Sequence, residues 1–154
     1  MCDVDKSRLN QAVKKYPSSK GFTDYRKLFD ELGKSIDAVT VSTPDHMHFH
    51  AALRAVQMGK HTYVQKPLTH SIWEARQLAL EAKKNKVITQ MGNQAHAGEP
   101  IRRAVELIRS GVIGKVKEVH AWTNRPIWPQ GLKDKLPAQE IPKNMNWDQW
   151  IGPA

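Results

Sequence analysis

The stretch Tyr63-Val64-Gln65-Lys66-Pro67 holds the residues that are best suited to chemistry. A β-prone apolar run stops at a lysine followed by proline, which predicts a short strand ending at Lys66. Pro67 restricts Lys66 to extended backbone angles and so helps to position its ammonium. Ligands of open α/β sheets bind outside the carboxyl ends of the strands. A cation there can orient a substrate hydroxyl and stabilise alkoxide character during hydride transfer. A surface lysine at a strand end is the alternative interpretation.

Two further polar residues follow expected strands. Asp3 lies within the stretch Cys2–Val4, which looks like the tail of a strand. Two hydrogen bonds from ribose hydroxyls to its carboxylate would favour NAD over NADP, whose 2′-phosphate would meet a negative charge. Helix capping is the alternative for an acid at this place, although Asp5 already offers that role. Asn93 is a candidate for contact with nicotinamide or substrate. Packing of Asn93 within its loop is an equally favoured alternative.

Histidines and tryptophans suggest two other kinds of site. His46 and His50 share one helix face and flank His48, but no nearby Cys or Glu completes a metal-ligand set, so no metal is expected. The apolar stripe of the same helix is expected in the core: Phe49, Ala52, Leu53 and Val56. Four tryptophans could stack on sugar rings, but packing is the favoured role for Trp122, Trp128, Trp147 and Trp150.

The elements that must position these residues alternate between strand and helix. Helices are expected from the Asp5 cap to Lys15, over 25–32 after a Thr23 or Asp24 cap, from the Thr43-Pro44 step to Met58, over 71–85 and over 99–109. Strands are expected over 36–42, 61–65, 86–91 and 116–123. This alternation predicts right-handed βαβ units, and therefore an α/β fold with a Rossmann-like parallel sheet and flanking helices.

The chain is expected to be part of a larger protein. No Gly-x-Gly-x-x-Gly turn occurs in it, so the first strand and its phosphate-binding turn are expected upstream of Met1. After Asn124, prolines and tryptophans crowd about 30 residues without periodicity. We expect residues 1–95 to form a partial nucleotide-binding domain, and residues 96–154 to form the truncated start of a second α/β domain.

Composition narrows the class of protein. The 154 residues are 40% hydrophobic and 25% charged, as in a soluble globular domain with one core. No apolar run approaches the roughly 20 residues of a membrane span, and no signal peptide is visible, so a cytoplasmic location is expected unless an export signal lies upstream. The formal charge of +9 is spread along the chain, which argues against nucleic acid and is compatible with dinucleotide phosphates. The single cysteine excludes an internal disulfide.

An ordered set of motifs resembles the glucose–fructose oxidoreductase / inositol dehydrogenase / MocA (Gfo/Idh/MocA) family along essentially the whole chain. The motifs are Ser42–His48, Met58–His61, Gln65–Pro67, Gln90–Gln94, Gly114–Val116, Trp122–Pro126 and Trp147–Pro153. The resemblance implies an NAD- or NADP-dependent oxidoreductase acting on a sugar, cyclitol or related polyol. It also implies a Rossmann domain followed by an α/β domain with a large open sheet, and a homo-oligomer for the full-length protein.

The resemblance also implies roles for individual residues. Lys66 corresponds to the family's lysine near the nicotinamide and the substrate hydroxyl, and Asp3 to its ribose-binding acid. The expected cofactor site is completed by Ser42, Thr43, Pro44, Gln65, Pro67 and Asn93, together with His48, for which a structural hydrogen bond is the favoured role. Two departures matter: Gln65 replaces the usual Glu, and no Asp-x-x-x-His segment follows Trp150. We therefore expect a fragment that is inactive alone; a non-enzymatic module for protein interaction or oligomerisation is the alternative.

Overall fold

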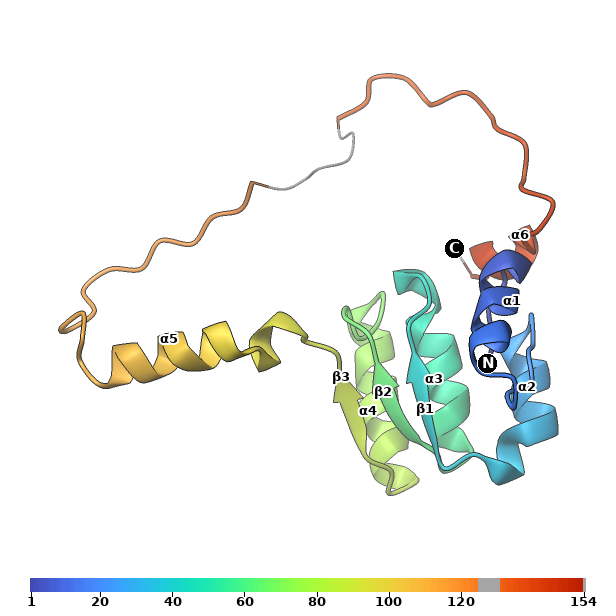
Figure 1. Cartoon of the computed structure of the whole chain (residues 1–154), viewed down its shortest axis with the longest axis horizontal. Helices are drawn as coiled ribbons and strands as arrows, with labels where there is room; N and C mark the ends of the chain where they lie inside the picture. Colours follow the sequence, from blue (N-terminus) through green and yellow to red (C-terminus); the bar gives the residue numbers. More distant parts are fainter. Residues whose placement is uncertain (125–130, 154) are drawn as a thin grey trace. The chain divides into compact units, whose positions relative to one another are not determined.

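The computed structural model describes residues 1–124 and 131–153 and is built on a parallel three-stranded sheet. The strands β1 (Ala38–Val41), β2 (His61–Val64) and β3 (Thr89–Met91) pair in the order β1-β2-β3 (Figure 1). Helix α3 (His48–Gln57) connects the first two strands, and helix α4 (Ile72–Lys84) connects the second and third. Helical crossovers are what parallel neighbours require. The expected α/β fold with a Rossmann-like parallel sheet is confirmed.

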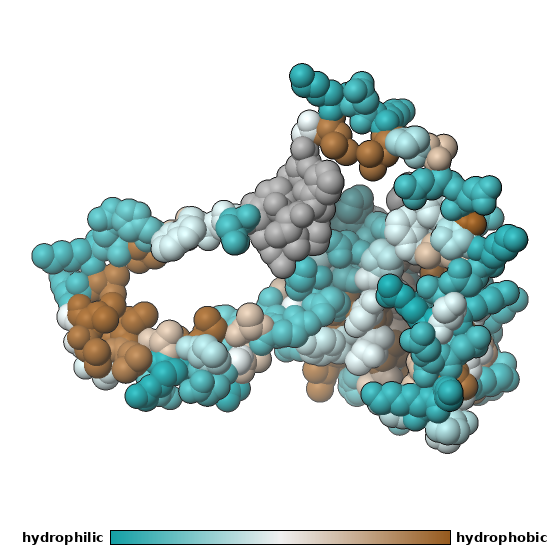
Figure 2. Space-filling view, turned by 45° about the horizontal axis from the view of Figure 1, so that its top comes forward, coloured by the Kyte–Doolittle hydropathy of each residue, from teal (hydrophilic) through white to brown (hydrophobic). Residues whose placement is uncertain are grey.

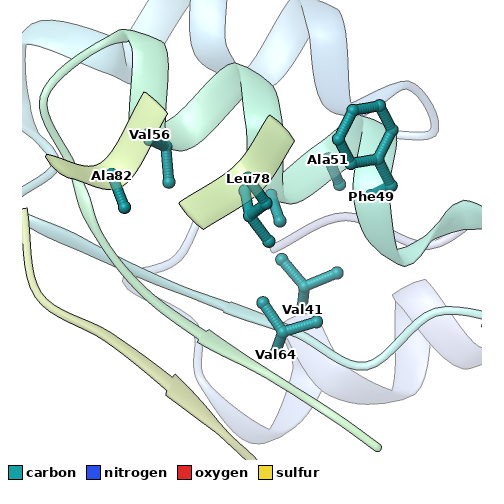
Figure 3. Close-up of a cluster of buried hydrophobic side chains, with 8 residues drawn as sticks. Val41, Phe49, Ala51, Val56, Val64, Leu78 and Ala82 are labelled. Atoms are coloured by element: carbon teal, nitrogen blue, oxygen red, sulfur yellow. The ribbon is translucent and has the colours of Figure 1, made fainter. Parts of the chain in front are cut away.

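The core lies between this sheet and helices α3 and α4 (Figure 3). Val41 and Val64 project from the strands, and Leu78 and Ala82 meet them from α4. The stripe expected on the third helix is confirmed, because its small and apolar residues are buried there and one is partly buried against the cluster: Phe49, Ala52, Val56 and Leu53. An amphipathic helix on a sheet face is stabilised mainly by this burial.

Three helix starts follow the expected capping chemistry. The Asp5 carboxylate accepts hydrogen bonds from the main-chain N–H groups of Ser7 and Arg8 at 2.8 and 3.4 Å and begins α1 (Lys6–Lys15). Asp24 caps α2 (Tyr25–Leu32), which runs into a short 3-10 turn, η1 (Gly33–Ser35). Ser71 and Glu74 form the predicted reciprocal capping box of α4.

The expected helix start at Thr43-Pro44 is wrong. Pro44 has extended backbone angles (φ −55°, ψ 149°), a 3-10 turn η2 (Asp45–Met47) follows, and α3 begins only at His48. The Thr43 carbonyl faces the His48 ring instead of opening a helix. The expected end of this helix is confirmed, because Gly59 follows it with a φ of +74°.

Two expected strands differ from the structure in the first 93 residues. Lys86 has a φ of +54°, outside the strand region, so β3 begins at Thr89 and not at residue 86. Near the N-terminus, Cys2 makes an isolated parallel bridge with Phe22 in place of a longer strand. The Phe22 N–H donates to the Met1 carbonyl at 2.9 Å, and the Asp3 N–H donates to the Phe22 carbonyl at 3.1 Å.

The chain forms two compact units: Met1–Asn93 with Ile141–Ala154, and Gln94–Glu140. The first includes α6 (Trp147–Ile151), whereas the expected domain boundary near residue 95 stays a prediction. The second contains η3 (Ala95–Ala97) and the predicted helix α5 (Glu99–Arg109). Apolar side chains gather on the surface of this second unit (Figure 2), among them Val105, Leu107, Ile108, Val112 and Ile113.

The strand expected over 116–123 is not formed. These residues are exposed, and the described part of the second unit offers them no neighbouring strand. A single strand without a pairing partner is not stable by itself. Across both described parts of the chain, none of the helices has the length and apolarity needed to cross a membrane.

Candidate functional site

Polar residues follow all three strands at the same edge of the sheet. Ser42 and Thr43 follow β1, Gln65 and Lys66 follow β2, and Asn93 follows β3 by one residue. The strands are parallel, so their carboxyl ends meet at one edge, which is where open α/β sheets bind ligands. Ser42, Thr43, Lys66 and Asn93 are exposed. The structure therefore brings most of the site residues predicted from the sequence to one edge of the sheet.

The Gln65 side chain supports the turn that carries Lys66. Its Oε1 accepts a hydrogen bond from the Lys66 main-chain N–H at 2.7 Å, and the following Lys66–Pro67 peptide bond is cis. A Cβ at Gly92 would lie 2.8 Å from the same Oε1, so the glycine leaves room for the Gln65 amide. Within the described residues, the Lys66 ammonium makes no salt bridge. The Lys66 side chain therefore extends from a turn that a hydrogen bond holds, and its ammonium is not paired with any described carboxylate.

His48 joins the turn after β1 to the turn after β2. Its side chain is fully buried, with Nε2 2.8 Å from the Thr43 carbonyl oxygen and Nδ1 2.5 Å from the Pro67 carbonyl oxygen. Carbonyl oxygens only accept, so the hydrogen bond forms at a ring nitrogen that carries a proton. The contact makes His48 a brace between two segments of the candidate site. It stands on the first turn of α3, which the packing of Phe49, Ala52 and Val56 holds against the sheet.

A cavity of about 1080 Å³ extends from the β1 turn to the N-terminal segment. Asp3, Ser42, Thr43 and Pro44 line it, whereas Lys66, Pro67 and Asn93 do not. Asp3 is half-buried, and its Oδ1 accepts the Asp5 N–H at 2.9 Å. The volume of the cavity slightly exceeds the roughly 300–1,000 Å³ common for small-molecule sites. The structure thus places the ribose-binding candidate beside the β1 turn.

Cys2 lines the same cavity. Although the residue is exposed, restricted contact of its thiol with water and then the nearby Asp24 carboxylate raise the pKa of Cys2 to about 11. Asp24 itself is buried and receives hydrogen bonds from the Arg26 guanidinium, the closest at 2.8 Å, which lower the pKa of Asp24. This end of the cavity therefore holds a neutral thiol beside a paired carboxylate.

The contacts that residues 141–153 make beside the candidate site were not predicted from the sequence. The Gln149 amide donates to Asp24 at 3.1 Å, and His46 Nε2 lies 2.8 Å from the Trp150 carbonyl oxygen. Trp147 and Trp150 stack with ring centroids 5.1 Å apart, as expected of packing residues. Trp122 is highly exposed, and Trp128 lies outside the described residues. One local signal was available: Asn146 caps α6 by accepting the Gln149 N–H at 3.2 Å.

The residues present fit part of a dinucleotide. The Asp3 carboxylate suits ribose hydroxyls, the Ser42–Pro44 turn adjoins it in the cavity, and Lys66 stands at the same sheet edge. The sequence contains no Gly-x-Gly-x-x-Gly turn, so the chain does not provide the usual cradle for pyrophosphate. Within the described residues, no group of three or more His, Cys, Asp or Glu side chains could hold a metal ion.

Comparison with known proteins identifies the family. Residues 1–93 match the family model described as the oxidoreductase family with an NAD-binding Rossmann fold, Gfo/Idh/MocA. The chain belongs to the Gfo/Idh/MocA family. Its members bind NAD(P) and include oxidoreductases of sugars and inositols. The family match covers the sheet, both crossover helices and every residue proposed for the site.

The chain is similar to several members of this family. It is 34% identical over 97 residues to an uncharacterized oxidoreductase of Streptococcus pneumoniae, covering 62% of this chain and 26% of the relative. It is 31% identical over 113 residues to the scyllo-inositol 2-dehydrogenase (NAD(+)) of Bacillus subtilis, covering 73% of this chain and 32% of that protein. A crystal structure of a probable dehydrogenase from Thermotoga maritima superposes with a TM-score of 0.64 at 25% identity, covering 74% and 34% of the two chains. The chain thus spans about a quarter to a third of its relatives' length.

Proposed function

We propose that this chain is the nucleotide-binding portion of an NAD-dependent oxidoreductase that oxidises or reduces a sugar, cyclitol or related polyol. The observation that carries the proposal is the convergence of the β1, β2 and β3 turns at one sheet edge, with the exposed Lys66 among them. Similarity to the scyllo-inositol 2-dehydrogenase supports the substrate class. The relative's catalytic activity belongs to a protein more than twice as long, so the activity of this chain is part of the proposal.

Lys66 is the residue proposed to act on the substrate. Bound NAD would supply the hydride acceptor for alcohol oxidation. The Lys66 ammonium donates a hydrogen bond to the substrate hydroxyl oxygen and stabilises the negative charge that develops there. Gln65 holds the Lys66 main chain, and His48 holds the Pro67 carbonyl, so the lysine approaches from a braced turn. The sequence has no Asp-x-x-x-His segment to receive the proton, so we expect no turnover by these 154 residues.

Asp3 is the basis for proposing NAD over NADP. Its carboxylate lies in the cavity beside Ser42 and Thr43, where ribose hydroxyls can donate hydrogen bonds to it. A 2′-phosphate at this place would meet the negative charge. Because the pyrophosphate has no glycine turn to bind, we expect affinity to be far below that of an intact dinucleotide site.

Ligand-detected NMR tests this proposal, because saturation transfer reports weak binding directly. We expect saturable transfer to the adenosine protons of NAD and a weaker response with NADP. Asp3→Asn should weaken the NAD response about three- to tenfold. It should also narrow the difference between the NAD and NADP responses. The exposed acid Glu99 in the second unit provides the matched control, Glu99→Gln, which should change neither response. Lack of a saturable NAD response would refute cofactor binding, and measurable NAD reduction with an inositol would refute the expected inactivity.

A non-enzymatic interaction module is the second candidate. The specific observation in its favour is that, among residues 1–124 and 131–153, β1 pairs on one side only, which leaves a strand edge for another chain. Size-exclusion chromatography beside the NMR titration separates the two functions. A chain that responds to NAD as a monomer supports the oxidoreductase, and an obligate oligomer without NAD response supports the module.

A further inference from the structure

Helix α6 contacts the 3-10 turn η2, which directly follows the turn after β1. His46 stands in the middle of η2 and is separated from Trp150 of α6 by 104 residues, yet its Nε2 lies 2.8 Å from the Trp150 carbonyl oxygen. A carbonyl oxygen only accepts, so the Nε2–H of His46 donates this hydrogen bond. The bond is partly buried, and a hydrogen bond that is shielded from water is electrostatically stronger than an exposed one.

Ring contacts hold the same two residues together. The rings of His46 and Trp150 meet edge to face, with centroids 5.6 Å apart and planes at 70°. Trp147, at the start of α6, stacks on the Trp150 ring with the planes at 8°. Aromatic pairs in these two arrangements attract each other beyond the area that they bury. Ring packing therefore places the Trp150 main chain where its carbonyl meets His46.

A second contact between α6 and η2 adjoins the first. Gly152 follows α6 with a φ of +56°, and a Cβ added to it would overlap with the Sδ atom of the buried Met47. The Met47 N–H in turn donates to the Pro44 carbonyl at 2.9 Å. Pro44 belongs to the Ser42–Pro44 turn of the candidate site. The contacts of α6 thus reach this turn through η2.

The Ser42–Pro44 turn needs such support because its residues are exposed. His48 holds the Thr43 carbonyl, and Pro44 has no main-chain N–H to donate. The turn shares a cavity with Asp3 and with Trp150. A bond that fixes η2 therefore also limits the conformations open to the turn.

We propose that His46 is a positioning residue, which fastens η2 to α6 and thereby fixes the Ser42–Pro44 turn. The link joins the candidate site to a segment that lies far along the chain. Its effect on the cofactor rests on the proposed function, because the turn adjoins Asp3 in the cavity. A turn that is already ordered costs less free energy on binding than a turn that the ligand must order.

Two substitutions separate the donor of His46 from its ring. His46→Gln keeps an N–H donor near the position of Nε2 and loses the ring, whereas His46→Phe keeps a ring and loses the donor. Amide hydrogen exchange of the full 154-residue chain, followed by NMR, reports on η2 directly. We expect the Met47 N–H to exchange at least about threefold faster in His46→Phe than in the wild type, and less than about twofold faster in His46→Gln.

Internal and external controls distinguish a local effect from a loss of global stability. The Leu78 N–H, in the buried part of α4, should keep its exchange rate in both variants. His96→Phe makes the same change at an exposed histidine of the second unit and should leave the Met47 N–H unaffected. An unchanged Met47 rate in His46→Phe would overturn the proposal. Equal acceleration at Met47 and Leu78 would also overturn it, because the bond would then stabilise the unit as a whole.

Saturation-transfer NMR with NAD separates this proposal from the proposed function. His46→Phe should weaken the NAD response about threefold, and His46→Gln should restore most of it. Equal NAD responses of the wild type and His46→Phe, with the Met47 rate changed, would overturn the positioning role. Lack of an NAD response in the wild type, with the Met47 effect present, would count against the proposed function alone.

Discussion

At the scale of single residues, His48 organises the candidate site without facing it. Its ring is buried between two carbonyl oxygens, one from the turn after β1 and one from the turn after β2. Those turns carry Thr43 and Lys66, which are separated by most of a βαβ unit in the sequence. A buried polar side chain that donates a hydrogen bond contributes to stability, because its removal leaves the acceptor without that donor.

Replacement of His48 tests this role. His48→Ala should lower the free energy of unfolding by about 2–4 kcal/mol, because it creates a cavity and removes the ring N–H that faces the Thr43 and Pro67 carbonyls. His48→Gln should recover part of this loss, since its amide can donate to one carbonyl. Urea denaturation followed by circular dichroism measures both. His50→Ala, a change two residues away on the same helix at a half-buried position, should cost less than about 1 kcal/mol. Similar losses for the alanine variants at 48 and 50 would contradict the brace.

At the scale of elements, local chemistry was predictable and distant pairing was not. The Asp5 cap and the Ser71–Glu74 capping box involve residues within one helical turn, and both were read correctly from the sequence. The 116–123 segment has a strand-like pattern, yet a pattern cannot supply a neighbouring strand. Likewise, the gathering of the β1, β2 and β3 turns followed from the βαβ alternation. The His48 contact with Pro67 required the folded structure, because no spacing rule links them.

The start of α1 provides a prediction at this scale. The Asn144 side chain donates to the Asp5 carboxylate at 2.7 Å, and this bond is the largest cause that lowers the pKa of Asp5 below its ordinary value, ahead of the Ser7 and Arg8 N–H groups. A carboxyl whose pKa is lowered by folding stabilises the fold above its unfolded pKa, and this contribution is lost as the pH falls through the folded value. For Asp5 the loss therefore occurs below about pH 4.

Asn144→Ala should move the pKa of Asp5 up toward its ordinary value and shift the acid loss of α1 to higher pH. Carboxyl-carbon NMR titration measures the first effect, and helix content against pH measures the second. Asn85→Ala removes a side-chain amide at the end of α4, far along the chain, and should leave the Asp5 titration unchanged. An Asp5 titration unaffected by Asn144→Ala would show that the helix N–H groups alone set the pKa.

At the scale of the whole molecule, the two units differ in how their main chains are satisfied. The first unit has the sheet, its buried cluster and a returning C-terminal segment, whose Asn144 carbonyl and Asn146 N–H bond to Lys6 and Val4 at 2.9 and 3.1 Å. In the second unit, residues 116–124 and 131–140 are exposed and belong to no helix or strand. Regions with few buried contacts open at low free-energy cost.

Limited trypsin digestion should therefore begin in the second unit. Lys115, Lys117, Lys133 and Lys135 lie in its exposed, non-helical segments, and we expect cleavage there at least about tenfold faster than at Arg54 or Lys83. Those two residues are internal controls, because they have the same chemistry as cleavage sites but stand in α3 and α4 of the first unit. Mass spectrometry of timed samples orders the cuts. First cuts within α3 or α4 would show that the sheet unit, and with it the braced turns of the candidate site, is the less stable part of the chain.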